Sequence, residues 1–166
     1  MSDTPAPAAP RLLWRVLLYL ALVGLAVPFL RGNDRVSHGS ELAWLTVATL
    51  HALRVDAAQA GDVVSGSGFA MQIAPICDGV DLAVILGLAI LLSPAPWRLR
   101  LLGLGAALVL TQLFNLGRLV CMFLVGVHLH EYFDLFHHVL WQAVAILFCV
   151  GLYAAWLSRT PVPPRA

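Results

Sequence analysis

The chain has 166 residues, of which 60% are hydrophobic and 11% charged, and its formal net charge is +1. A mean hydropathy of +0.86 excludes an ordinary soluble domain and is typical of a small polytopic membrane protein. The length fits one domain, and the small net charge gives no indication of a nucleic-acid partner. Three cysteines supply neither a CxxC pair nor an even disulfide framework.

We interpret residues 1–166 as a single all-α membrane domain, a bundle of four transmembrane helices. The Pro/Ala-rich residues 1–10 are predicted to be disordered. The apolar run Leu12–Leu30 would extend about 28 Å as a helix, close to a bilayer core of about 30 Å. No small-x-small cleavage site follows directly, so we expect an uncleaved first span. The other three spans are predicted at about Gly79–Ser93, Leu101–Val125 and His138–Leu157.

Residues 31–76 form a polar region, which we expect to be extracytoplasmic. Ser40 is predicted to cap a helix that ends at Leu53, with Glu41 in its first turn. This helix is too short to span a membrane, and its apolar stripe favours a position on the membrane surface. The stripe consists of Leu42, Leu45, Thr49 and Leu53.

The end of this region predicts a small β-hairpin. Val63 and Val64 precede a Ser-Gly-Ser-Gly turn, and the residues from Phe69 to Ile73 alternate in polarity. Pro75 ends the hairpin and favours extended geometry at Ala74.

The arginines predict the orientation. With both termini in the cytoplasm, the inner segments hold six arginines and the outer segments three, among acidic residues. The positive-inside rule therefore favours cytoplasmic termini and an extracytoplasmic polar region. The inner residues are Arg11, Arg15, Arg98, Arg100, Arg159 and Arg165, and the outer ones are Arg31, Arg35 and Arg54.

This topology brings three reactive side chains to one level of the membrane. Cys77 lies just before the second span, and His137 lies just before the fourth. Arg118 is the eighteenth residue counted from Leu101, about 26 Å along the third helix and thus near its outer end. We therefore expect Cys77, Arg118 and His137 to lie close together.

Arg118 is the least expected residue of a membrane helix, because a central arginine costs about 2.5–3.5 kcal/mol to insert. Together with Gln112 and Asn115 it forms a polar stripe with a spacing of three. A structural role is the alternative, in which Arg118 forms an ion pair with Asp81, or with Asp78, and locks two helices together.

Cys77 is the candidate nucleophile, because a helix N-terminus and a nearby arginine both favour an anionic sulfur. Cys121 and Cys149 fall within apolar helices, and we interpret them as packing residues. His137 and His138 can act as acid or base near neutral pH. A competing interpretation is a metal site formed by residues of the same loop, although no HExxH motif is present. Its ligands would come from His128, His130, Glu131, Asp134, His137 and His138.

The order of these motifs resembles the exosortase/archaeosortase family. The matching residues are Cys77-Asp78-Gly79 before a membrane helix, Asn115-Leu116-Gly117-Arg118 near the outer end of the next, and His137-His138-Val139-Leu140-Trp141 at the start of the last. The match covers residues 74–157, which we take as the catalytic core. The short length resembles the compact members of the exosortase H kind. Many members have Ser in place of Asp78 and Gly in place of Trp141, so His138 remains an alternative to His137.

The resemblance implies a cysteine peptidase or transpeptidase of the plasma membrane, active on its extracytoplasmic face and without a metal or other cofactor. Its substrates would be exported proteins that end in a short motif, a transmembrane helix and a basic tail. Cys77 would form a thioester, Arg118 would bind the substrate carbonyl or oxyanion, and His137 would transfer protons. Two alternatives stay open: a metal-dependent membrane enzyme or metal carrier, and a non-catalytic membrane assembly factor.

Overall fold

The computed structural model describes residues 9–31 and 38–160 and confirms a polytopic helical bundle with a small β-sheet. Of the segment predicted to be disordered, residues 1–8 lie outside the described residues, and helix α1 begins at Ala9. The elements are α1 (Ala9–Arg31), α2 (Gly39–Ala52), β1 (Ala58–Ala60), β2 (Val63–Gly66), β3 (Phe69–Gln72), η2 (Pro75–Cys77), α3 (Val80–Leu92), α4 (Trp97–His128), η3 (His130–Tyr132), α5 (Phe133–Leu135), η4 (Phe136–Leu140) and α6 (Trp141–Arg159).

Three helical segments in the described part of the chain are long and apolar enough to cross a membrane. They are Leu13–Leu30, Trp97–His128 and His130–Arg159. The second predicted span, Gly79–Ser93, corresponds to α3, which has 13 residues and is therefore about 20 Å long. Since a bilayer core is about 30 Å thick, α3 alone falls short, and the count of four spans stays a prediction.

Helix α3 lies at the centre of the bundle and packs against α1, α4 and α6. The contact with α4 and α6 is apolar, formed by Leu86 and Ile90 of α3, Ala107 of α4 and Trp156 of α6. Helix α1 has a largely exposed surface, and its Tyr19 hydroxyl donates to the carbonyl oxygen of Ile85 at 3.1 Å. An apolar exposed surface of this kind suits a lipid environment.

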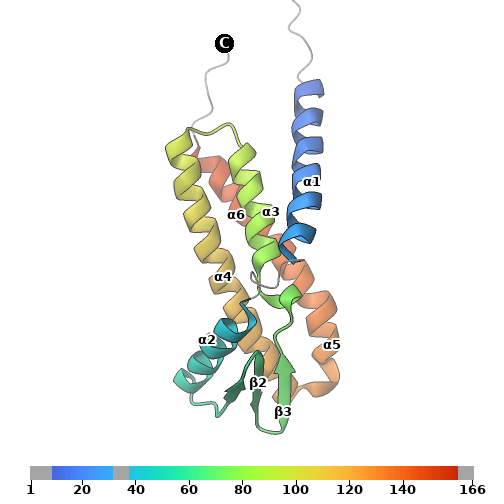
Figure 1. Cartoon of the computed structure of the whole chain (residues 1–166), viewed down its shortest axis with the longest axis vertical. Coiled ribbons are helices and arrows are strands. Elements are labelled where there is room, and N and C mark those ends of the chain that lie inside the picture. The colour runs from blue at the N-terminus through green and yellow to red at the C-terminus, as the bar shows by residue number, and fades with distance from the viewer. Residues whose placement is uncertain (1–8, 32–37, 161–166) are drawn as a thin grey trace, which may run out of the picture.

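The bundle has two distinct ends (Figure 1). The start of α1, the α3–α4 connection and the end of α6 lie at one end, whereas α2, the sheet and α5 lie at the other. At the first end, Arg100 donates to the carbonyl oxygens of Leu91 and Ala95 at 2.9 and 2.7 Å. The guanidinium therefore satisfies carbonyls at and just beyond the C-terminal end of α3, which have no helical partners.

The structure corrects the local details of α2. His38 occupies the N-cap, and the hydroxyl of Ser40 donates to the Glu41 carboxylate instead of capping the backbone. A backbone hydrogen bond and this hydroxyl lower the pKa of Glu41. Of the predicted apolar stripe, Leu42 is buried, whereas Leu45 and Leu53 are exposed, and the position of this helix on the membrane surface stays a prediction. The buried residues are Gly39, Leu42, Ala43, Thr46 and Leu50, which face α4 and the sheet.

The hairpin prediction is confirmed, and β1 adds a third strand that the sequence did not reveal. Strands β2 and β3 pair antiparallel from Val63 with Gln72 to Gly66 with Phe69. The two-residue turn between them is Ser67-Gly68, and both residues have positive φ angles, 50° and 79°, as hairpin turns of type I′ require. Ala74 is extended, as expected before Pro75.

Phe69 fixes the sheet to the helices. Its ring lies 6.0 Å from that of Phe123 in α4 and 5.4 Å from that of Phe133 in α5. Gly126 of α4 lies directly beneath the ring, because a Cβ atom built at this glycine would collide with Phe69. The sheet can therefore approach α4 this closely only because residue 126 has no side chain.

We expect Gly126→Ala to lower the thermal stability of the purified protein, because the added methyl group must displace the Phe69 ring. Overpacking of this kind typically costs about 1–3 kcal/mol. Gly105→Ala is the matched control, since it lies in the same helix and a Cβ atom there meets nothing within 4 Å. Equal unfolding temperatures for the two variants would contradict the described contact.

Candidate active site

Cys77 lies in a short irregular segment before α3. The N–H of Cys77 donates to the carbonyl oxygen of Ala74 at 2.7 Å and closes the single turn of η2. The side chain of Asp78 then accepts from the N–H of Val80 at 2.9 Å, and Gly79 has a φ angle of 78°. The carboxylate of Asp78, and not the thiol, therefore binds at the N-terminus of α3.

The guanidinium of Arg118 lies against the sulfur of Cys77. Its Nη2 atom is 3.9 Å from Sγ, and its Nε atom is buried without a hydrogen-bond partner in the described structure. Cys77 itself is 7% exposed, so little water competes for this contact. The predicted convergence of Cys77 and Arg118 from two helices is thus observed, and the guanidinium provides a positive charge beside the sulfur.

Asn115, which lies one turn before Arg118 in α4, also contacts Cys77. Its Nδ2 atom donates to the carbonyl oxygen of Cys77 at 2.9 Å, and the side chain is fully buried. The sequence placed Asn115 in the polar stripe of Arg118 but did not reveal this contact. Its spacing of three from Arg118 was the available signal.

His137 lies in η4, a π-helical turn between α5 and α6. Its ring stacks on Phe133 with centroids 5.9 Å apart and planes within 6°. It is half-buried, and both Arg118 and Asp134 are close enough to act on it electrostatically. A π turn often occurs at functional sites, and here it separates the histidine from the regular helix α6, which begins at Trp141 and not at the predicted His138.

The neighbouring His138 has a different environment. It is exposed, and its ring lies edge-on to that of His137, with centroids 4.6 Å apart. The structure therefore favours His137 over His138 as the residue near Arg118. Trp141 packs edge-on against Phe114 of α4, four residues before Arg118, and so holds the start of α6 beside this part of α4.

The histidines and acids of the His128–His138 segment are not grouped as ligands of a metal ion. Within the described ranges, no group of three or more His, Cys, Asp or Glu side chains is arranged to hold a metal ion. The metal interpretation of the His128–His138 segment therefore has no support in the geometry. Cys121 and Cys149 are half-buried within α4 and α6, and both have free thiols.

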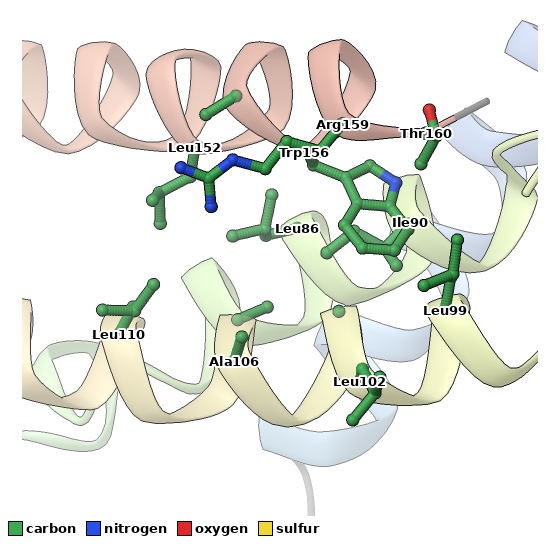
Figure 2. Close-up of a pocket in the computed structure, with 13 residues that line it drawn as sticks. Leu86, Ile90, Leu99, Leu102, Ala106, Leu110, Leu152, Trp156, Arg159 and Thr160 are labelled. Atoms are coloured by element: carbon green, nitrogen blue, oxygen red, sulfur yellow. The ribbon is translucent and has the colours of Figure 1, made fainter. Parts of the chain in front are cut away.

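The pocket in Figure 2 lies away from these residues, between α3, α4 and α6. It has a volume of about 340 Å³, and apolar side chains such as Leu86, Leu110 and Trp156 line most of it, with Arg159 and Thr160 also present. None of the residues that line it is a cysteine, a histidine or an acid. A second, larger groove of about 830 Å³ lies between α3 and α4 and extends from Gly87 and Leu104 to Glu41 of α2. It includes Val80, three residues after Cys77.

Comparison with known proteins identifies the family of the chain. A family model described as transmembrane exosortase (Exosortase_EpsH) matches residues 6–156. No curated protein and no solved structure matches the chain. The matched range includes every helix that contributes to the site, together with Cys77, Arg118 and His137. The chain therefore belongs to the transmembrane exosortase family.

Proposed function

We propose that this chain is a cysteine peptidase or transpeptidase embedded in the plasma membrane, which cleaves C-terminal sorting signals of exported proteins. The contact of Arg118 Nη2 with Cys77 Sγ at 3.9 Å carries this proposal. A thiolate is a strong nucleophile, and a guanidinium beside it stabilises its charge. Membership of the transmembrane exosortase family supports the assignment.

In the first half of the reaction, the Cys77 thiol gives its proton to His137, and the sulfur attacks the scissile carbonyl carbon to form a tetrahedral intermediate. Arg118 donates hydrogen bonds to the negatively charged oxygen, for which its fixed fork of N–H groups is suited. The C–N bond then breaks, His137 gives a proton to the leaving amine, and a thioester remains on Cys77.

In the second half, His137 removes a proton from an acceptor, which is water in hydrolysis or an acceptor nucleophile in transfer. The acceptor attacks the thioester carbonyl, and the sulfur of Cys77 leaves as thiolate beside Arg118. The same three side chains thus serve both halves, and no cofactor takes part in any step.

The proposed substrates end in a short motif, a transmembrane helix and a basic tail. The apolar groove between α3 and α4 supports this class, because an apolar helix of the substrate can lie there within the bilayer. Val80 lines the groove close to Cys77, so the motif that precedes the substrate's helix would meet the nucleophile.

We place the active site on the extracytoplasmic face, with both termini of the chain in the cytoplasm. Arg15, Arg98 and Arg159 lie on segments at the end of the bundle opposite the sheet (Figure 1), and arginines favour the cytoplasmic side. A sorting signal on an exported protein is presented on the outer face, where this orientation puts Cys77.

We expect Cys77→Ala and Cys77→Ser to abolish cleavage of a sorting-signal reporter while the protein still accumulates, because the nucleophile is lost. Cys121→Ala and Cys149→Ala are matched controls and should retain substantial activity. Immunoblotting of precursor and cleaved reporter measures the outcome. Normal processing by Cys77→Ala would show that Cys77 is not the nucleophile and would favour a non-catalytic assembly role.

Two single substitutions distinguish the roles of His137 and His138. His137→Gln should lower the cleavage rate by about 10²–10⁴-fold, the usual contribution of general acid–base catalysis. His138→Gln should cleave at nearly the wild-type rate, because this ring is exposed. Initial rates with purified protein in detergent distinguish the two. A larger loss for His138→Gln than for His137→Gln would reverse the assignment.

The orientation is tested by labelling single cysteines in a background of Cys77→Ser, Cys121→Ala and Cys149→Ala. A membrane-impermeant maleimide added to intact cells should label Ala60→Cys, which lies in exposed strand β1. Ser158→Cys, at the other end of the bundle, should react only after permeabilisation. The opposite pattern would place the site in the cytoplasm.

A further inference from the structure

We propose that Asn115 is a positioning residue that holds the main chain of Cys77 so that its sulfur stays against Arg118. This inference rests on the proposed function. It begins from the hydrogen bond that Asn115 Nδ2 donates to the Cys77 carbonyl oxygen at 2.9 Å. Cys77 is the last residue of η2, and α3 begins only at Val80, so the carbonyl of the nucleophile lies between two helical elements.

One turn of α4 therefore holds Cys77 at two points. Asn115 binds its carbonyl oxygen, and Arg118, three residues later, contacts its sulfur at 3.9 Å. Residues spaced by three on a helix lie on the same face, and the helix fixes the distance between them. The separation of the nucleophile from the guanidinium is thus set by a single rigid element once Asn115 binds the backbone.

Gly79 brings the backbone onto the amide. A Cβ atom at this glycine would lie 3.0 Å from both Cβ and Cγ of Asn115, and the φ angle of 78° is one that side chains rarely permit. The amide is therefore confined between Gly79 and the Cys77 carbonyl. This arrangement fixes which way the Nδ2 donor points.

The amide oxygen of Asn115 indicates that packing alone does not explain why an asparagine occupies this position. Asn115 Oδ1 is buried and has no hydrogen-bond partner in the described structure. An unpaired buried acceptor is destabilising, and an apolar side chain would fill the position without that loss. The unpaired Oδ1 therefore lowers stability, while the Nδ2 donor of the same amide binds the backbone of the nucleophile.

Thr111 provides the contrast within the same helix. It lies four residues before Asn115 and is equally buried, but its hydroxyl donates to the carbonyl oxygen of Ala107 in its own helix at 2.8 Å. Thr111 thus forms its hydrogen bond within α4, whereas Asn115 forms its hydrogen bond to the segment that contains the nucleophile. Thr111→Val is therefore a control for the loss of a buried polar group from α4.

The experiment measures kcat and KM of purified full-length protein with a sorting-signal reporter. Asn115→Ala and the isosteric Asn115→Asp should lower kcat by about 10²-fold, the effect of misplacing a reacting group by about 1 Å. KM should change little, because Asn115 holds the nucleophile and not the substrate. Thr111→Val should retain wild-type kcat.

A double-mutant cycle with Arg118→Lys separates positioning from general stability. Since Asn115 acts by aligning the sulfur with the Arg118 guanidinium, Asn115→Ala should cause only a small further loss in the Arg118→Lys protein. Additive losses, a wild-type kcat in both Asn115 variants, or failure of both to fold would overturn the inference. Cleavage of the reporter by Cys77→Ala would contradict the proposed function itself. If Cys77→Ala is inactive but the Asn115 variants cleave at the wild-type rate, the positioning role alone is wrong.

Discussion

An arginine within a membrane helix needs an electron-rich partner, and in this protein the guanidinium of Arg118 contacts the sulfur of Cys77. The contact depends on a difference in length between two neighbouring helices. Helix α3 has 13 residues and begins at Val80, whereas α4 has 32 and continues well past Arg118. The irregular segment before α3 therefore lies against the side of α4, where Asn115 and Arg118 reach it.

The small sheet supports the site through aromatic rings. Phe69 of β3 packs on Phe123 of α4 and on Phe133, and Phe133 in turn stacks on His137. The imidazole is thus connected to the sheet through two rings, while the sheet is fixed to α4 by its close approach at Gly126. A polar segment that appears peripheral in the sequence therefore fixes the orientation of the proposed acid–base group.

The sequence was sufficient to predict the level at which the site forms but not its local geometry. Counting helix rise placed Arg118 beside Cys77, because the rise of a helix is constant. It did not reveal that the Asp78 carboxylate accepts from the N–H of Val80 or that η4 is a π turn. The apolar stripe of α2 also did not reveal which of its residues contact protein, because Leu42 is buried whereas Leu45 and Leu53 are exposed. Hydrophobicity alone does not distinguish residues that face protein from those that face lipid.

The central claim is that Cys77 carries an acyl group during cleavage. The most direct measurement is the intact mass of purified protein, quenched with acid during a single turnover of a sorting-signal peptide. We predict an adduct with the mass of the peptide's N-terminal fragment, located on Cys77, released by hydroxylamine and absent from Cys77→Ala. Cleaved peptide without such an adduct, formed equally by Cys77→Ala, would contradict the account.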